Sequence, residues 1–170
     1  MTAFGYLRAM VVFTAACLAA PVALAQVPPE AFAFGKDALV YLPAGFEEAP
    51  GSGEILQVQS TDRGSIRLSL ELRDAGRERN SGEAAIRALA KQKRLQTRRS
   101  GKKLVVLEPR SEGQVDGRPT RSMRVGVGFG RSMVVMTLTV FEDEKDAHRV
   151  RHFFDVELEE IIASIRRTGG

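Results

Sequence analysis

The sequence predicts an α+β sandwich in which a mostly antiparallel sheet is flanked by a middle helix and a C-terminal amphipathic helix. Three observations predict it. Residues 65–72 alternate between polar and apolar side chains, which is typical of an antiparallel strand with one solvated face. Short turn sequences join the strand-like segments after residue 101, which indicates hairpins and not crossovers. Apolar residues recur at three- and four-residue spacing over residues 150–165, which predicts a helix packed on an apolar surface.

Residues 1–25 have the pattern of a secretory signal peptide. Arg8 precedes an apolar span, residues 9–24, which ends in a small-x-small cleavage triplet at residues 23–25. A proline interrupts the span and no basic residues close it, so a retained transmembrane anchor is disfavoured. Lipidation of Cys17 is also disfavoured, because no leucine opens the preceding triplet and the apolar run continues beyond the cysteine. We therefore expect an exported, periplasmic protein that is soluble after cleavage.

Residues 26–170 are expected to form a single domain with a short N-terminal leader. They are 145 of the 170 residues, which is enough for one ordinary hydrophobic core. Arg8 is the only charge in the signal segment, so cleavage leaves 24 of 25 basic residues against 21 acidic ones, a net charge of +3. The sole cysteine, Cys17, is removed, so the mature chain has no thiol for a disulfide, a metal site or a nucleophile.

The first half of the mature chain predicts a leader followed by strands. Phe32 and Phe34 of the leader are expected to pack back on the domain. Pro43 stops the first strand, and the turn-rich sequence "EAPGSG" separates it from the next. We expect these strands at residues 39–42, 54–60 and 65–72.

The middle helix is expected to begin after Asn80. Asn80 suits the N-cap position, and Glu83 stands where a capping box places a carboxylate that reaches back to the cap amide. Ile86, Leu89 and Ala90 then form a narrow apolar stripe. Gly101 ends this segment.

The second half predicts hairpins and a closing helix. Turns are expected at Asp116-Gly117 and at residues 128–130. The strands between them are expected at residues 102–108, 111–115, 120–127 and 131–143. The helix should run from about Ala147 to Arg166 and pack on the sheet through Phe153, Phe154, Leu158, Ile161 and Ile165.

The order of elements over residues 36–167 carries a resemblance. A strand ends in "YLPAGFEE", antiparallel strands and a middle helix follow, and "QVDGRPTRSMRV", "SMVVMTLTVF" and a helix ending in "EEIIASIR" close the chain. This layout resembles the PsbP and Mog-like superfamily, including DcrB-like bacterial envelope proteins. Such proteins often carry Trp after the first turn, where this chain has Phe46. The resemblance implies a binding or assembly module without shared catalytic residues.

The glycine-rich sequence "VGVGFG" superficially suggests a nucleotide-binding loop, with Gly126, Gly128 and Gly130. Such a loop must open a helix whose N-terminus holds the phosphate, whereas a β-pattern follows here. We therefore interpret these glycines as a hairpin turn or bulge.

A metal site is conceivable where His148, His152, Asp155 and Glu159 share one stripe of the closing helix. The stripe points away from the apolar face, where nothing would orient the imidazoles or exclude water, so we favour a solvated helix face. No "GxSxG" elbow presents a serine nucleophile. The sequence thus predicts no catalytic residue, no metal and no cofactor.

Eight basic and no acidic residues lie in residues 84–107. Arg87, Lys91, Arg94 and Arg98 have helical spacing and would form one basic ridge, which is our candidate partner-binding surface. Lys93 falls near the apolar side, so the helix is also open to ending near residue 95, with a basic loop after it. The plain alternative is a solvated face, opposite acidic residues at 142–146 or 155–160.

These features predict an exported, non-enzymatic module that engages a protein of the cell envelope. The alternative is a peripheral binder of anionic membrane surface that uses the basic segment 87–103. Nucleic acid is disfavoured, because the protein is exported and residues 84–107 contain no aromatic side chain on which a base could stack. The sequence does not indicate the oligomeric state.

Overall fold

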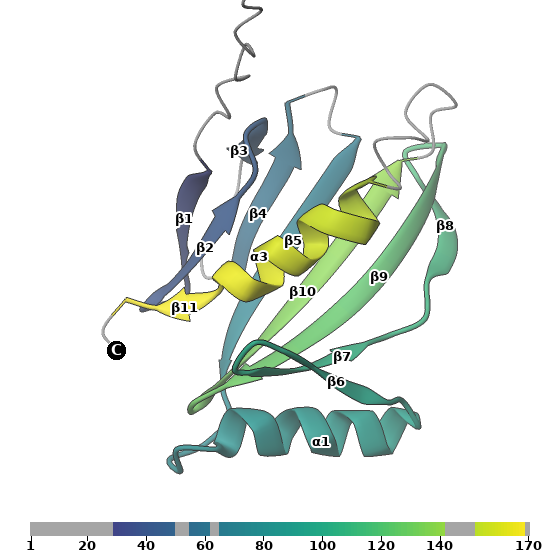
Figure 1. The fold of residues 1–170 in the computed structure, drawn as a ribbon. Helices are drawn as coiled ribbons and strands as arrows, with labels where there is room; N and C mark the ends of the chain where they lie inside the picture. The colour runs from purple at the N-terminus through teal and green to yellow at the C-terminus, as the bar shows by residue number, and fades with distance from the viewer. Residues whose placement is uncertain (1–28, 50–54, 62–64, 142–151, 169–170) are drawn as a thin grey trace, which may run out of the picture.

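The structure is a computed structural model that describes residues 29–49, 55–61, 65–141 and 152–168 (Figure 1). The predicted signal peptide and the expected start of the closing helix lie outside these residues. Within them, no helix is long and apolar enough to span a membrane.

An eight-stranded sheet forms the centre of the domain, and every strand pairing in it is antiparallel. This confirms the predicted α+β class. Strand β8 pairs with β9 beside the main path, whose order is β3-β4-β5-β10-β9-β7-β6. The strands are β3 (Phe46–Glu48), β4 (Ile55–Ser60), β5 (Ile66–Asp74), β6 (Thr97–Ser100), β7 (Lys103–Leu107), β8 (Ser111–Val115), β9 (Arg118–Phe129) and β10 (Ser132–Phe141).

A small second sheet, in the order β1-β2-β11, lies beside the first. Phe32 and Phe34 are buried, which confirms that the leader packs back on the domain. They do so within a strand that pairs with β2, which the sequence did not predict. The strands are β1 (Glu30–Phe34), β2 (Ala38–Leu42) and β11 (Arg166–Arg167).

The closing helix covers one face of the large sheet (Figure 1). It consists of a π-helical turn, Phe153–Glu157, and α3, Leu158–Ser164. The predicted packing is confirmed: Phe154 is half-buried, and the fully buried members are Phe153, Leu158, Ile161 and Ile165. The predicted end at Arg166 is wrong, because the chain leaves the helix after Ser164 to pair as β11.

Helix α1, Ser81–Lys93, packs on the opposite face of the sheet. Strand alternation sends Val105 into the core beneath α3 and sends Leu104 and Val106 to α1, where they meet Ile86 and Ala90. The predicted start is confirmed, but the predicted capping box is wrong. Asn80 makes no side-chain capping hydrogen bond, and the carboxylate of Glu83 binds arginines instead.

The glycines of "VGVGFG" belong to the β9–β10 hairpin, as the hairpin interpretation expected. Gly130 lies in the turn with φ of +54°. Gly128 lies in β9 under α1, where an added Cβ would come within 2.4 Å of the Gly82 carbonyl oxygen. Gly82 in turn donates a backbone hydrogen bond of 3.0 Å to the Gly130 carbonyl. These glycines let the helix approach the sheet closely.

Candidate binding surfaces

The four residues of the predicted basic ridge do not form a ridge. Arg87 and Lys91 lie on α1, Arg94 follows its last residue, and Arg98 lies on β6. The helix ends in a Schellman motif: Arg94 takes a left-handed conformation, with φ of 55°, and Leu95 donates its backbone N–H to the Ala90 carbonyl. This turn lets Leu95 pack on the apolar cluster under α1.

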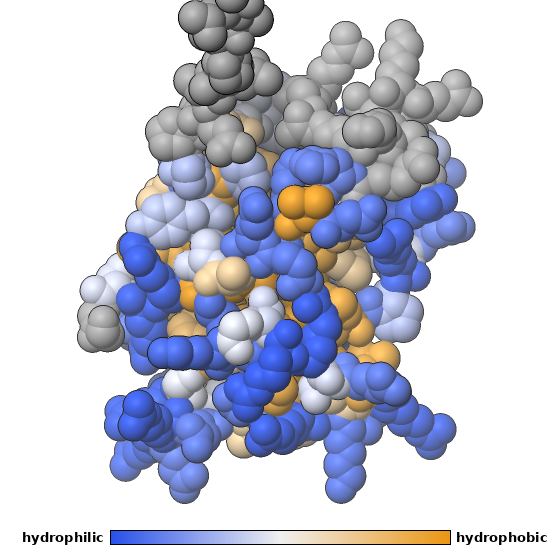
Figure 2. Space-filling view, viewed as in Figure 1, coloured by the Kyte–Doolittle hydropathy of each residue, from blue (hydrophilic) through white to orange (hydrophobic). Residues whose placement is uncertain are grey.

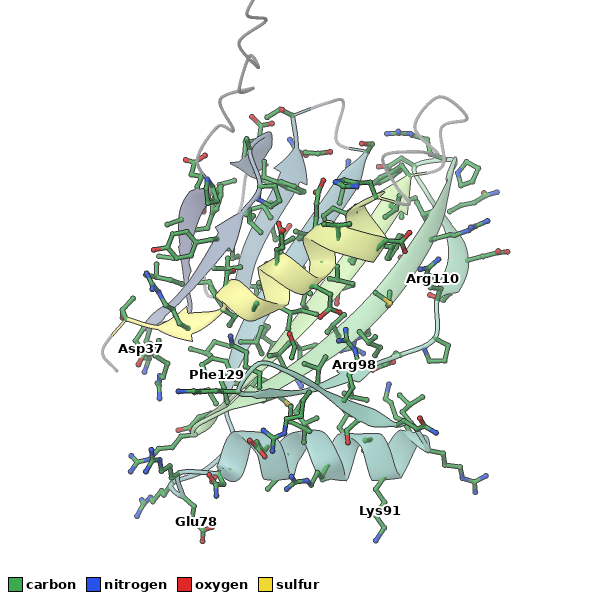
Figure 3. All side chains as sticks on the ribbon, in the orientation of Figure 1. Asp37, Glu78, Lys91, Arg98, Arg110 and Phe129 are labelled. Atoms are coloured by element: carbon green, nitrogen blue, oxygen red, sulfur yellow. The ribbon has the colours of Figure 1, made fainter. Side chains whose placement is uncertain are left out.

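Arg98 turns toward α3, whereas Lys91 points away from the domain (Figure 3). The Arg98 guanidinium binds both carboxylate oxygens of Glu159, with Nη1 3.0 Å from Oε2. Hydrogen bonding from Arg98, opposed by partial burial, holds the pKa of Glu159 below its ordinary value. For Arg98, the alternative that the basic side chains face the acidic residues at 155–160 is confirmed.

Most other basic side chains of the segment are also engaged within the domain. Glu83 binds Arg87 at 3.3 Å and Arg99 at 2.8 Å, and the Lys93 ammonium lies 2.7 Å from Glu108. Lys103 donates a hydrogen bond to the carbonyl of Ala163, and burial lowers the pKa of Lys103. Figure 2 shows the resulting face around α3 as predominantly hydrophilic.

Three of the eight basic residues, Lys91, Arg94 and Lys102, have no ion-pair partner among the described residues. Lys91 and Arg94 lie near the C-terminal end of α1, just before the β6–β7 hairpin begins. Lys102 lies in the turn between β6 and β7, at the opposite end of that hairpin (Figure 1). The partner-binding role of this segment stays a prediction.

The histidine and carboxylate stripe does not assemble in the described chain. His152 is exposed and lies 3.8 Å from Glu157, while Glu159 is occupied by Arg98. His148 lies outside the described residues. Among the side chains that the structure places, no three potential metal ligands come together.

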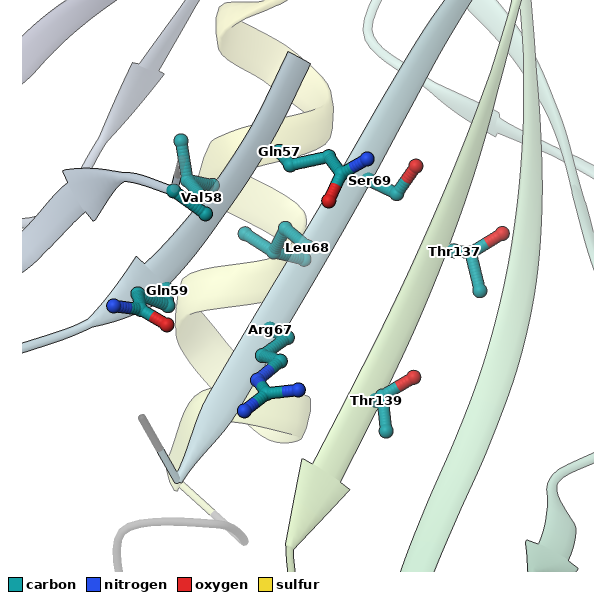
Figure 4. A pocket seen from close by; sticks show the side chains of 9 residues that line it. Gln57, Val58, Gln59, Arg67, Leu68, Ser69, Thr137 and Thr139 are labelled. Atoms are coloured by element: carbon teal, nitrogen blue, oxygen red, sulfur yellow. The ribbon is translucent and has the colours of Figure 1, made fainter. Parts of the chain in front are cut away.

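A different surface is hollowed: the face of the large sheet opposite α3, beyond the edge of α1. We call it the open face. Its polar side chains come from β4, β5 and β10, and α3 lies behind the sheet in this view (Figure 4). They surround a hollow of about 330 Å³ and are Gln57, Gln59, Arg67, Ser69, Thr137 and Thr139.

A buried aromatic ring supports one rim of this hollow. Phe141 projects toward the open face at the end of β10 and is only 1% exposed. The guanidinium of Arg67 lies 4.7 Å from the centre of its ring, and that of Arg118 lies 4.4 Å away. Such cation–π contacts limit how far Arg67 can move while they leave its donors available.

A second hollow, of about 180 Å³, lies where the open face meets α1. Arg124 lines it together with Lys93, Glu108 and Arg73, and its apolar lining includes Leu89, Met133 and Val135. Hydrogen bonding from Arg73, opposed by slight desolvation and aided by the charges of Arg73 and Arg124, lowers the pKa of Glu71 on the same face.

The sequence contained a signal for the open face. Arg67, Ser69 and Glu71 were identified there as a wet side of one strand, but not as part of a site. Their neighbours Thr137 and Arg124 lie 53 or more residues away along the chain, and only the pairing of β5, β10 and β9 brings them together.

Comparison with sequence models of protein families and with curated proteins found no match. Solved structures with similar folds were found. A Bacteroides thetaiotaomicron protein has a TM-score of 0.61 at 16% identity, over 84% of this chain and 48% of its own. This chain thus spans about half the length of that protein.

Two further structures with similar folds are of named proteins. The Ran-binding protein Mog1p of Saccharomyces cerevisiae has a TM-score of 0.50 at 10% identity, over 82% of this chain and 95% of its own. PsbP of the cyanobacterium Synechocystis has a TM-score of 0.33 at 12% identity, over 88% of this chain and 98% of its own. The relation to DcrB-like proteins stays a prediction. The similarity to Mog1p confirms that this chain has a PsbP/Mog-like fold.

Proposed function

We propose that this chain is an exported, non-enzymatic binding module of the bacterial cell envelope that engages a protein partner through its open face. The observation that carries the proposal is the hollowed open face, where Arg67 and Arg124 make no ion pair with a described residue. The signal-peptide pattern of residues 1–25 supports export. The fold shared with a Ran-binding protein supports a role in protein binding.

The chemistry of the open face favours binding over catalysis. A serine or threonine nucleophile needs an adjacent general base. Ser69 and Thr137 make no side-chain hydrogen bond with any described residue, and the hydroxyl of Thr139 lies 3.2 Å from that of Ser122. Amides, hydroxyls and guanidinium groups are instead suited to hydrogen bonding with a partner surface.

The proposal is tested by blocking the open face with a neutral side chain. Thr137→Tyr puts an aromatic ring into the larger hollow and suits a strand. Ala88→Tyr is the matched control, because Ala88 is exposed on α1. The immobilised protein is incubated with envelope extract, and the captured proteins are compared by mass spectrometry. We expect Thr137→Tyr to lose a protein that wild type and Ala88→Tyr both retain. Equal capture by all three, or loss with Ala88→Tyr alone, would contradict the proposal.

Binding to anionic membrane through the basic segment 87–103 is the second candidate. The observation that favours it is the exposure of Lys91 and Arg94 without described ion-pair partners. If this candidate is right, the protein should sediment with phosphatidylglycerol vesicles at low salt and be released near 0.15 M salt, where the Debye length is about 8 Å. The double variant Lys91→Glu/Arg94→Glu should not sediment with the vesicles. Absence of wild-type sedimentation at low salt would eliminate this candidate.

A further inference from the structure

The register of the sheet places two arginines on either side of a pair of threonines. Arg67 of β5 lies directly opposite Thr139 of β10, and Arg124 of β9 lies directly opposite Thr137. Each arginine is therefore also a diagonal neighbour of the other threonine, which is within reach of a long side chain. With strands 4.7–4.9 Å apart, the two arginine Cα atoms are separated by roughly 12 Å, with β10 between them.

The electrostatics of this arrangement are unbalanced. On the open face, Arg73 pairs with Glu71 at 2.7 Å and Lys93 pairs with Glu108 at 2.7 Å. Arg67 and Arg124 make no ion pair within the described part of the chain, and Glu71, on which the charge of Arg124 acts, is already held by Arg73. The guanidinium of Arg67 and the hydroxyls of Ser69 and Thr137 therefore face the larger hollow with unused hydrogen-bonding capacity, and the guanidinium of Arg124 lines the adjoining smaller hollow.

The neighbouring hollow has a different character. Next to Thr137 along β10 on this face come Val135 and Met133, and Leu89 of α1 completes an apolar wall. Alternate residues of an extended chain are roughly 7 Å apart, as are successive side chains on one face of β10. One extended segment can thus contact the cationic hollow and the apolar wall with side chains two residues apart.

We propose that the open face recognises an acidic segment of a protein, with a carboxylate bound by Arg67 and Arg124 above Thr137 and Thr139 and an apolar side chain, two residues away, against Val135 and Leu89. This rests on the proposed function, in that it assumes that the open face is the docking surface. Charge complementarity selects the occupant: arginine forks bind carboxylates in a bidentate manner, and hydroxyls donate to the remaining oxygen lone pairs.

The apolar wall distinguishes a protein segment from a simple anion. Inorganic phosphate satisfies the arginines but leaves the wall of the second hollow uncovered. A lipid surface is flat on this scale, whereas the hollow lies in the angle between the sheet and α1. A peptide backbone with one acidic and one apolar side chain covers both hollows.

Binding of a defined peptide tests the inference. The probe is a blocked heptapeptide with one glutamate and one leucine two residues apart in a glycine and serine background, titrated into the isotope-labelled protein and followed by amide NMR shifts. We expect shifts at Thr137, Thr139 and Val135, and at least about tenfold weaker binding when glutamine replaces glutamate, because charge-assisted hydrogen bonds are lost. Alanine in place of leucine should weaken binding by about fivefold or more.

Protein variants complete the test. Arg124→Gln should weaken binding of the acidic peptide about tenfold without unfolding, because Arg124 is exposed and makes no ion pair with a described residue. Arg67→Gln should do the same, with its urea midpoint measured because this change also uncovers Phe141. Lys91→Gln removes the same charge on α1 and should leave binding unchanged.

Several outcomes would overturn the inference. These are equal affinity for the glutamine peptide, equal affinity of Arg124→Gln, or shifts confined to α1. Stronger open-face shifts with inorganic phosphate or phosphatidylglycerol vesicles than with the peptide would overturn it too. If Arg124→Gln still captures the protein that Thr137→Tyr loses, the acidic-segment inference fails while the proposed function stands.

Discussion

Replacing Gly128 with alanine probes how closely α1 lies on the sheet. A Cβ at Gly128 would lie 2.4 Å from the Gly82 carbonyl oxygen, 2.8 Å from its carbon and 2.7 Å from Cγ1 of Ile86. Two of these atoms are backbone and cannot rotate away. The first turn of α1 must therefore move, and the 3.0 Å hydrogen bond from Gly82 to the Gly130 carbonyl must lengthen.

The expected destabilisation follows from these contacts. Overpacking a core by one methyl group costs about 1–3 kcal/mol, and a weakened backbone hydrogen bond adds about 1 kcal/mol. Restricting the unfolded chain offsets about 0.4–1 kcal/mol. We expect Gly128→Ala to lower the free energy of unfolding by about 2 kcal/mol. Gly126→Ala should cost less, because its contacts at 2.9 Å are the side-chain ends of Ile86 and Val106.

Urea denaturation followed by far-UV circular dichroism measures the effect. Gly113→Ala is the matched control, because its Cβ would meet only the Thr120 hydroxyl, at an ordinary 3.6 Å, and the change should stay within about 1 kcal/mol of wild type. A Gly128→Ala protein as stable as wild type, or a control that is equally destabilised, would show that α1 does not rest on β9 as described.

Three further predictions concern the closing helix and the N-terminus. Phe153→Ala should cost about 3–5 kcal/mol, because Phe153 is 0% exposed, whereas half-buried Phe154→Ala should cost clearly less; the reverse order in urea denaturation would contradict the packing. Arg98→Ala should cost at most about 1 kcal/mol at neutral pH. Because the pKa of Glu159 is lowered in the folded state, the Arg98–Glu159 ion pair stabilises the folded protein fully above the ordinary pKa of 4.5. The stability difference between wild type and Arg98→Ala should therefore vanish as pH falls through the lowered pKa; a difference in melting temperature that does not change with pH would refute this role of the ion pair. Intact-mass measurement of the exported protein should give a chain that begins at Gln26, and a chain retaining residues 1–25 would contradict the cleavage site.

Much of the architecture could be predicted from local patterns. The alternation in β5 and the 3–4 spacing of Phe153, Leu158 and Ile161 depend on burial of one face, which residue types record directly. The short strands β3, β6 and β11 could not be predicted, because two to four residues are too few to show a periodicity and become strands only by pairing with a neighbour.

The basic ridge shows why the site was harder to predict. Helical spacing predicted that Arg98 and Arg87 lie on one helix. The helix instead ends where Leu95 turns back onto the apolar cluster, with Arg94 in the left-handed position that glycine usually fills. No glycine marks the end, and the local signal is Lys93 near the apolar side; the alternative that the helix ends near residue 95 is confirmed. The open face depends on pairing between strands distant in sequence, and single-strand patterns register only that Arg67 is wet.

Site-specific photo-crosslinking in cells that express the protein tests most directly whether the open face is the docking surface. A benzophenone amino acid is placed at Ser69, on the open face, and separately at Lys91, on the exposed side of α1. We expect a discrete crosslinked protein from Ser69 on irradiation, which the acidic heptapeptide competes away, and none from Lys91. A crosslinked protein from Lys91 with none from Ser69 would contradict this expectation.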